Sequence, residues 1–266
     1  MKRLVTSIAK AAARLAGLDL LTLAYHDIGI LKFENPGASG EEYLIREVLR
    51  ARVPDTGTAV FLDVGANVGT IALLLRRTFP AAEIWAFEPN RAAYDILSER
   101  ASGQRVTCVN IGLGNARRTE TLYLPADVGR SSSATTHRKL LEDFHHTADV
   151  REVRFEMHTL DQFCSERGIR AIDFLKVDTE GSELAVLEGA RGLLSRNKVG
   201  VIQFEFGECH VFSRTFIRDF YQLLDGYRFH RLDSSRLIPL GDYHVAHEIF
   251  RFQNIVAIRR DDAAGR

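Results

Sequence analysis

The stretch Ala59-Val60-Phe61-Leu62-Asp63-Val64-Gly65-Ala66-Asn67-Val68-Gly69 indicates the fold class. Its first four residues form a compact apolar run, as in a buried strand, and residues 71–79 are apolar enough for a helix that lies on a sheet. The glycines between them let the backbone turn tightly and approach a ligand without a Cβ. Amides exposed at the start of the next helix suit a carboxylate or a phosphate. This order predicts a ligand site at the carboxyl end of the strand, the alternative being that the glycines only make a turn.

Outward from this stretch, short apolar runs alternate with helical patterns, which is typical of a largely parallel sheet with crossover helices. The pattern predicts strands at residues 59–62, 84–87, 105–110, 174–177, 201–205, 227–232 and 254–258, and helices at 71–79, 90–101, 182–194 and 216–224. Asn90 and Ser213 are the expected N-caps of the second and the last of these helices. Residues 111–160 interrupt the alternation, with short strands at 119–124 and 150–157 around a polar loop that is either a lid or a solvent loop.

The second strand ends at Glu88-Pro89, and Glu88 follows Gly65 by 23 residues. This is close to the spacing at which an acid meets ribose hydroxyls in nucleotide-binding folds, and a carboxylate can accept two hydrogen bonds from a vicinal diol. Alone, Glu88 could be an ordinary acid at the end of a strand. Together with the glycine loop it predicts a cofactor that contains adenosine.

The residue pattern of the glycine loop also favours one class of cofactor over the others. It has neither the Gly-x-Gly-x-x-Gly spacing of dinucleotide enzymes nor the Gly-Lys-Ser/Thr ending of a phosphate-binding loop. The leading Asp63 would repel phosphate, but its carboxylate could accept hydrogen bonds from an α-amino group, which S-adenosylmethionine carries. A nicotinamide-dependent oxidoreductase stays the main alternative. The predicted cofactor-binding residues are Asp63, Gly65, Asn67, Gly69, Glu88, Asn110 and Asp178.

Four motifs in series resemble the FkbM-type methyltransferases, a class I family that uses S-adenosylmethionine. They are residues 61–69, Ala86-Phe87-Glu88-Pro89-Asn90, Leu160-Asp161-Gln162-Phe163, and residues 172–183, which contain Lys176-Val177-Asp178-Thr179-Glu180-Gly181. The resemblance implies an α/β fold of the Rossmann-like class I type, with seven mostly parallel strands, one antiparallel strand and helices on both faces. The resemblance covers about residues 55–258, and we expect a methyltransferase domain at residues 51–262 after an N-terminal helical extension at residues 1–50. It also implies methyl transfer, usually to oxygen, on a sugar, glycan, glycolipid or other small natural product. Thr179 and Ser182 depart from the family pattern in ways that affect packing more than chemistry.

Methylation of an alcohol requires a group that removes the hydroxyl proton. Asp178 and Glu180 follow the fourth strand and are the first candidates, although Glu180 could instead cap the next helix. Glu205 lies in an apolar strand, where a buried acid needs a partner. His210 is a further candidate base, and His137 is an alternative to it. Glu205 and Glu208 could join Asp178 around a divalent metal ion, but we expect no metal.

Composition narrows the partners. The chain carries 35 Lys and Arg against 35 Asp and Glu, so no net charge attracts nucleic acid, and we expect none as a partner. Three dispersed cysteines are typical of a reducing, cytoplasmic setting. Residues 4–25 are expected to form an amphipathic helix that packs on the domain, touches a membrane surface or forms a homodimer contact. Aromatic residues near the end of the chain could form a wall for the acceptor or pack on that helix: Tyr243, His244, His247, Phe250 and Phe252.

Overall fold

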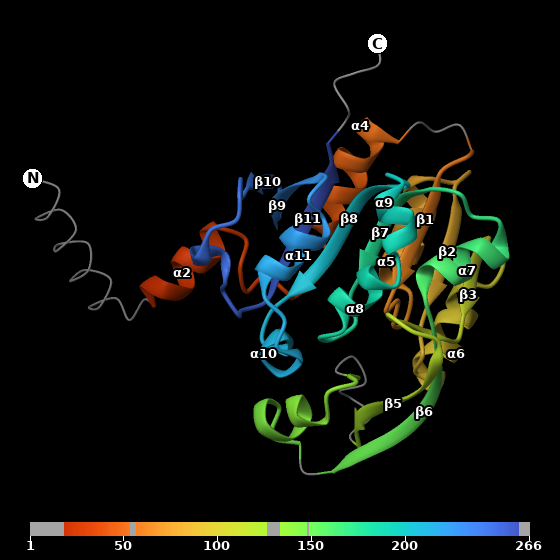
Figure 1. The fold of residues 1–266 in the computed structure, drawn as a ribbon, viewed down its shortest axis with the longest axis horizontal. Coiled ribbons are helices and arrows are strands. Elements are labelled where there is room, and N and C mark those ends of the chain that lie inside the picture. The colour runs from red at the N-terminus through yellow and green to blue at the C-terminus, as the bar shows by residue number, and fades with distance from the viewer. Residues whose placement is uncertain (1–18, 54–56, 127–133, 148, 261–266) are drawn as a thin grey trace, which may run out of the picture.

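The computed structural model describes residues 19–53, 57–126, 134–147 and 149–260. Within these ranges, eight strands form the main sheet in the order β10-β9-β11-β8-β7-β1-β2-β3 (Figure 1). They are β1 (Val60–Val64), β2 (Glu83–Phe87), β3 (Val106–Val109), β7 (Ile172–Val177), β8 (Val199–Phe206), β9 (Tyr227–Asp233), β10 (Arg236–Pro239) and β11 (Gln253–Arg259). The pairs from β8 to β3 are parallel, so the carboxyl ends of these strands meet at one edge.

The seven predicted strands are all present, and one extra strand lies at the edge of the sheet. β11 pairs antiparallel with both β8 and β9, as expected of the single antiparallel strand in the predicted seven-stranded sheet. β10 pairs antiparallel with β9 after a turn at Ser234 and Ser235, and the sequence pattern did not predict it. The sheet therefore has the predicted architecture with one additional hairpin.

Helices cover both faces of the main sheet, because successive side chains of each strand point to opposite sides. In β1, Phe61 packs on one side with Leu75 and Phe174, and Leu62 packs on the other with Leu187 and Leu175. The first side is covered by α5 (Thr70–Thr78), α6 (Arg91–Ala101) and a continuous helical segment made of α3 (Glu41–Tyr43), η1 (Leu44–Leu49) and α4 (Arg50–Arg52). The second side is covered by α7 (Leu160–Arg167), α8 (Glu183–Glu188), α9 (Arg191–Ser195) and α11 (Ile217–Leu223).

The N-terminal region divides into two parts. Helix α2 (Leu20–Asp27) begins at Asp19, whose side chain accepts a hydrogen bond from the Leu21 amide, and no side chain of α2 is buried. Most of the helix predicted for residues 4–25 precedes the described residues. Ile30, in contrast, pairs with Gln253 at the start of β11. Leu44, Ile45 and Leu49 are fully buried, so residues 30–53 share the core that packs on the main sheet.

One predicted helix is wrong in its extent. Residues 182–194 form two helices, α8 and α9, which are separated at Gly189 and Ala190. A Cβ at Gly189 would lie 2.0 Å from the carbonyl oxygen of Gly114, so the backbone approaches a distant loop at this point. The carboxylate of Asp161 accepts hydrogen bonds from the amides of Gly192 and Leu193, at 2.6 and 2.8 Å. The side chain of Asp161, which is distant in sequence, thus starts a new helix where the local pattern predicted a continuous one.

The predicted N-cap at Ser213 is also wrong. Ser213 ends a short helix, α10 (Cys209–Ser213), and α11 begins later, after Phe216. The first amides of α11, at Ile217 and Arg218, donate to the carboxylate of Glu248 at 2.9 and 3.0 Å. Since Glu248 supplies this cap from 30 residues away, no local pattern reveals it.

The insertion at residues 111–160 forms a separate sheet with the strand order β4-β6-β5. Its strands are β4 (Gly112–Leu113), β5 (Arg118–Pro125) and β6 (Val150–His158), and η3 (Leu140–Phe144) lies between the last two along the chain. The strands predicted at 119–124 and 150–157 are therefore confirmed. In Figure 1 this sheet lies beyond the carboxyl ends of the main strands. A last helical turn, η4 (Val245–His247), precedes β11. Among the described residues, no helix has the length and apolar character needed to cross a bilayer.

Candidate functional site

A cavity of about 200 Å³ lies between the carboxyl ends of the main strands and the three-stranded sheet. Six predicted site residues line it: Gly65, Asn67, Glu88, Asp178, Glu180 and Glu205. Apolar side chains from the loops and the small sheet complete the wall, including Phe87, Ile111, Leu113, Leu122, Phe155 and Met157. Asp63, Gly69, Asn110 and His210 do not line the cavity. The structure therefore brings together residues that lie up to 140 positions apart in the sequence.

The glycine loop closes one end of this cavity. Gly65 has φ +79°, and a Cβ added there would lie 1.7 Å from the carbonyl oxygen of Asp178. The amides of Gly65 and Ala66 both donate to the carbonyl of Phe87, which ties the loop to the end of β2. Gly69, at φ +84°, starts α5 and packs against Leu97. Gly65 thus shapes the cavity directly, and Gly69 positions the helix that follows the loop.

Glu88 is held rigidly at the cavity wall. Its two carboxylate oxygens accept hydrogen bonds from the amides of Asn67 and Asn90, both at 2.8 Å. Burial raises the pKa of Glu88 to about 7, although these amides oppose the shift. The side-chain amide of Asn110 donates to the carbonyls of Glu88 and Pro89, at 2.8 and 3.2 Å. Asn110 therefore positions the turn that carries Glu88. Because a carboxylate can accept about four hydrogen bonds, Glu88 can still accept those of a vicinal diol.

A buried charge network lies beneath the cavity and centres on Lys176. Its ammonium nitrogen lies 2.7 Å from Oδ2 of Asp178 and 3.8 Å from Oε1 of Glu41. Burial lowers the pKa of an amine, but Asp178, Glu41 and Asp63 outweigh burial, so the pKa of Lys176 is raised. A buried ammonium group needs such partners. The network therefore fixes the Asp178 carboxylate at the cavity wall.

Asp63 belongs to this network more than to the cavity. It is opposite Lys176 in the parallel pairing of β1 and β7, and its side chain is fully buried. Burial raises the pKa of Asp63 to about 6, and the charge of Lys176 opposes the shift. Neither carboxylate oxygen has a hydrogen-bond partner among the described residues. The contact between Asp63 and an α-amino group stays a prediction.

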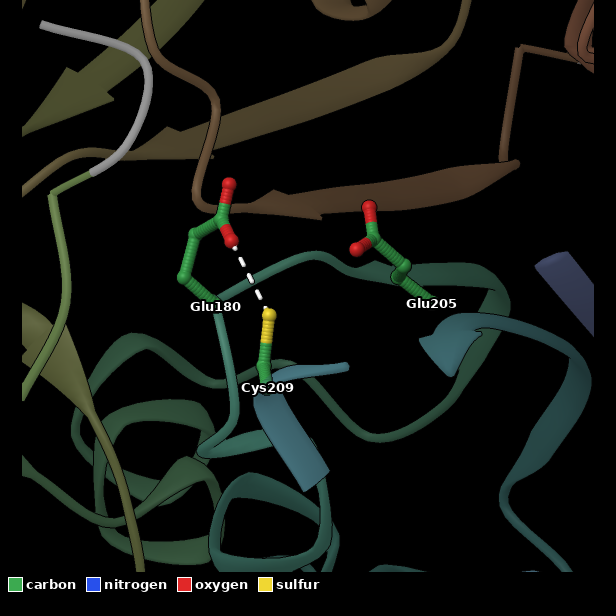
Figure 2. A group of neighbouring side chains, drawn as sticks. All are labelled: Glu180, Glu205 and Cys209. Carbon is green, nitrogen blue, oxygen red and sulfur yellow. Dashed lines mark hydrogen bonds between the residues drawn. The ribbon is translucent and has the colours of Figure 1, made fainter. Parts of the chain in front are cut away.

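Glu180, Glu205 and Cys209 form a cluster of ionisable side chains, and the two glutamates of this cluster line the cavity. Figure 2 shows the two carboxyl groups pointing to the same side, with the Cys209 thiol approaching from below. The thiol donates to Oε2 of Glu180 at 3.2 Å. Burial, followed by the charge of Asp178, raises the pKa of Glu180 to about 8. Burial, Asp178 and Glu180 raise the pKa of Glu205 well above its usual range. Burial and the neighbouring negative charges thus favour the protonated form of both carboxyl groups.

The same three side chains are the group in the described residues whose atoms could surround a metal ion, since one ligand atom from each lies within 4.8 Å of the others. This set differs from the predicted one, because Glu208 points to Arg251, at 3.4 Å. Metal ligands must lose their protons, whereas burial raises the pKa of the Cys209 thiol and the carboxyl pKa values are raised as well. A cation would have to displace these protons, and the expectation of no metal stays a prediction.

His210 is held away from the cavity. It is 1% exposed, its Nε2 lies 3.0 Å from Oε2 of Glu183, and its Nδ1 accepts from the amide of Gly207. Its ring lies against Phe206 and Phe220. Both ring nitrogens therefore face protein groups, and the geometry does not support the predicted role of His210 as the catalytic base.

Glu183 organises the loop that carries Asp178 and Glu180. Its Oε1 accepts from the amide of Thr179 at 2.7 Å, and its Oε2 accepts from the amide of Gly181 at 3.0 Å. Burial opposes ionisation, but His210 and the amides outweigh it and lower the pKa of Glu183. Glu183, and not Glu180, thus binds the amides before α8. Glu180 has φ +54° and keeps its side chain in the cavity.

The predicted lid contributes to the same loop where it is described. Thr135 Oγ1 donates to the carbonyl of Glu180 at 2.8 Å, and the hydroxyls of Thr136 and Ser182 lie 2.8 Å apart. His137 Nε2 lies 3.3 Å from the carbonyl oxygen of Gly181, and burial lowers the pKa of this histidine. Residues 131–133 of the predicted loop lie outside the described ranges. The described part packs on the β7–α8 loop as a wall of the cavity.

Three residues of the site were not predicted: Glu41, Glu183 and Cys209. Glu183 had a local signal, because it is an acid at the start of a helix, where amides lack partners. Cys209 had none. Glu41 lies 135 residues before Lys176 and was assigned to the N-terminal extension. Only the packing of residues 30–53 against the sheet brings it to the site.

Replacing Glu205 by glutamine is expected to raise the melting temperature at about pH 8 and to leave it unchanged at about pH 5. The folded state keeps a proton on Glu205 that the unfolded chain releases above the usual pKa of glutamate, so stability falls as pH rises through this window. A neutral glutamine removes this loss, and we expect a gain of about 3–6 °C, or about 1–2 kcal/mol. Thermal unfolding at both pH values checks this, and an equal gain at pH 5 and pH 8 would contradict it.

The chain is similar in sequence to known methyltransferases. Residues 63–230 match the family model described as the methyltransferase FkbM domain. The chain is 35% identical to methyltransferase sdnD from Sordaria araneosa over 154 residues, which cover 48% of this chain and 59% of that protein. It is 25% identical to hexuronic acid methyltransferase AglP from Haloferax volcanii over 169 residues, which cover 63% of this chain and 64% of the other. A solved structure, methyltransferase FkbM from Methylobacillus flagellatus KT, aligns with a TM-score of 0.49 and 17% identity over 88% of this chain and 49% of that one.

The chain thus spans less than two thirds of the length of each of these relatives. The family match covers more than half of the chain, and it includes the glycine loop, Glu88 and the segment from Lys176 to Glu183. The motifs whose residues line the cavity therefore lie inside the region that matches the family model. The chain belongs to the FkbM methyltransferase family.

Proposed function

We propose that the chain is an S-adenosylmethionine-dependent O-methyltransferase that acts on a hydroxyl of a sugar, a glycan or glycolipid, or another small natural product. One observation carries this proposal: a single cavity is lined by the Glu88 carboxylate and by three further acidic residues, Asp178, Glu180 and Glu205. The first suits the ribose of an adenosine, and the second suits a reacting centre that carries positive charge and releases a proton.

The residues present fit S-adenosylmethionine. Glu88 would hold the ribose hydroxyls, and the apolar wall near Ile111 and Leu113 would hold the adenine. The absence of a Cβ at Gly65 keeps the loop close to the carbonyl of Asp178. Asp178, Glu180 and Glu205 would face the sulfonium. When bound, S-adenosylmethionine supplies an electrophilic methyl group.

The chain's own task is to place the acceptor hydroxyl and to take its proton. Asp178 lies at the end of β7 with one carboxylate oxygen fixed by Lys176 and its side chain 33% exposed. It can therefore bind or orient an acceptor hydroxyl. Glu180 and Glu205 line the same cavity, and the raised pKa of Glu180, about 8, suits proton transfer close to neutral pH. Because these acids interact, the proton belongs to the group and not to one residue.

The names of the relatives support a hydroxyl acceptor. One relative is the 2-O-methyltransferase NoeI of Sinorhizobium fredii, at 25% identity over 52% of this chain and 60% of that protein. The hexuronic acid methyltransferase already described is named for a sugar acid. The zero net charge supports a neutral or small acceptor over nucleic acid. All three cysteines are free, which supports a reducing compartment such as the cytoplasm.

Calorimetric titration separates this proposal from a nicotinamide-dependent oxidoreductase. We expect S-adenosylhomocysteine to bind, with or without a chelator of divalent metals, and NAD not to bind. Glu88→Gln should weaken S-adenosylhomocysteine about 10–100-fold, because it removes charge-assisted hydrogen bonds. Glu83→Gln is the matched control, since Glu83 lies at the opposite end of β2 and contacts Trp85. Binding of NAD alone, or equal effects of the two substitutions, would refute the proposal.

A further inference from the structure

A second cavity, of about 170 Å³, lies on the other side of Asp178 and Glu205 from the cofactor cavity. Both residues line both cavities, so the two cavities adjoin at Asp178 and Glu205. The remaining lining comes from the segment 33–41 and from the start of β11: Phe33, Asn35, Pro36, Ser39, Glu41, Phe252 and Asn254. The candidate proton acceptors can therefore be reached from two directions.

The segment 33–41 is held in place by contacts with the rest of the molecule. The Leu31 amide donates to the carbonyl of Phe252 at 2.8 Å, next to the pairing of Ile30 with Gln253. A Cβ at Gly40, which has φ +86°, would lie 2.3 Å from the carbonyl oxygen of Asp233. Glu41 Oε1 accepts from the side chain of Gln203 at 3.0 Å. The N-terminal segment is therefore fixed against the carboxyl edge of the sheet and forms one wall of the cavity.

The chemistry of this cavity differs from that of the first. The Phe33 ring is 64% exposed and meets Phe252 edge-on, with ring centroids 5.7 Å apart. Opposite this aromatic wall, the amide oxygen of Asn35 accepts from two backbone amides, and that of the buried Asn254 accepts from Gln203. No described residue accepts a hydrogen bond from the amide nitrogen of Asn254. Amide groups and the carboxyl groups of Glu41, Asp178 and Glu205 beside an exposed ring suit a ring molecule with several hydroxyls and one apolar face.

We propose that the second cavity is the acceptor site and that it takes a pyranose ring, which packs on Phe33 and presents one hydroxyl to Asp178 and Glu205. This rests on the proposed function, because the methyl donor must occupy the first cavity. The hydroxyl oxygen forms a bond to the methyl carbon as the S–CH₃ bond of the donor breaks. The bonding electron pair stays on sulfur, which gives S-adenosylhomocysteine, and the hydroxyl proton passes to an ionised carboxylate where the two cavities adjoin. Phe33 then determines acceptor affinity without touching the cofactor.

The test measures methyl transfer, as a gain of 14 Da, to methyl pyranosides (hexoses, 6-deoxyhexoses and hexuronic acids) and to non-carbohydrate alcohols such as catechol. We expect at least one pyranoside to be methylated. Phe33→Ala should raise its KM about tenfold by removing the aromatic contact, while Phe33→Tyr keeps it. Phe144→Ala is the matched control, because Phe144 is an exposed ring that lines neither cavity.

No methylation of any pyranoside, or an unchanged KM in Phe33→Ala, would overturn the proposal. Titration with S-adenosylhomocysteine distinguishes the two levels of failure. If the unaltered chain binds S-adenosylhomocysteine but gives these negative results, only the acceptor site is rejected. If the unaltered chain does not bind S-adenosylhomocysteine, the proposed function is rejected. The sugar ring could belong to a lipid-linked glycan or to a free sugar, and an octyl pyranoside of the accepted sugar separates these two sources. A much lower KM for the octyl pyranoside than for the methyl pyranoside indicates a lipid-linked glycan.

Discussion

Replacement of Asp178 by asparagine is expected to lower kcat by about 10²–10⁴-fold, the usual contribution of a positioned acid or base. Asparagine keeps the shape of the side chain but cannot take a proton, and it loses the ion pair with Lys176. Binding of S-adenosylhomocysteine should change much less, because Glu88 and the glycine loop supply most of the cofactor contacts. Single-turnover kinetics with a methylated acceptor, together with calorimetry, measures both effects.

Asp173→Asn is the control for this experiment. Asp173 lies near the start of the same strand, β7, and its Oδ2 accepts from the amide of Val60, far from the cavity. Its loss should affect stability and leave kcat within a few fold of the unaltered chain. If Asp178→Asn retained most of the turnover, Asp178 would be neither the base nor the group that orients the acceptor, and Glu205 would be tested next.

Gly65→Ala is expected to abolish binding of S-adenosylhomocysteine and to destabilise the fold by about 3 kcal/mol or more. The added methyl group would overlap the carbonyl of Asp178, and a φ of +79° is unfavourable for any residue with a Cβ. The loop and the β7–α8 segment would have to separate, which moves Glu88 and Asp178 apart. Thermal unfolding and calorimetry of the folded fraction measure the two consequences.

Gly103→Ala separates the effect of crowding from that of backbone strain. Gly103 has φ +72°, but a Cβ there meets no atom within 4 Å. Its replacement should therefore cost only the left-handed backbone strain, about 1–2 kcal/mol, and leave cofactor binding intact. Equal losses of stability and equal binding in the two variants would show that the contact between Gly65 and Asp178 is unimportant.

The parts of the site that the sequence predicts are those formed by neighbours along the chain. The glycine loop, the turn at Glu88 and the pair Asp178 and Glu180 each follow a strand, and parallel strands bring their carboxyl ends to one edge. Local spacing therefore sufficed for five residues of the cavity wall, and Glu205 was predicted instead as an acid within an apolar strand. The same logic predicted the Asn90 cap of α6, which accepts from the Ala92 amide as expected.

The parts that the sequence does not predict depend on long-range contacts. Glu41 accepts a hydrogen bond from Gln203, which lies 162 residues later in the sequence. Glu248 caps α11 by accepting from the amide of Ile217, 31 residues earlier. The break between α8 and α9 depends on Asp161 and on the approach of Gly114, neither of which is adjacent in sequence. His210 looked like a free base in a polar loop, but burial pairs it with Glu183. Side-chain direction and tertiary packing decide these features, and hydrophobic periodicity does not report them.

The measurement that tests the central claim most directly is a crystal structure of the chain grown with S-adenosylhomocysteine. We expect the ribose hydroxyls within hydrogen-bond distance of the Glu88 carboxylate and the sulfur facing Asp178 and Glu205. An adenosine bound outside this cavity, or a ribose that makes no contact with Glu88, would contradict the account.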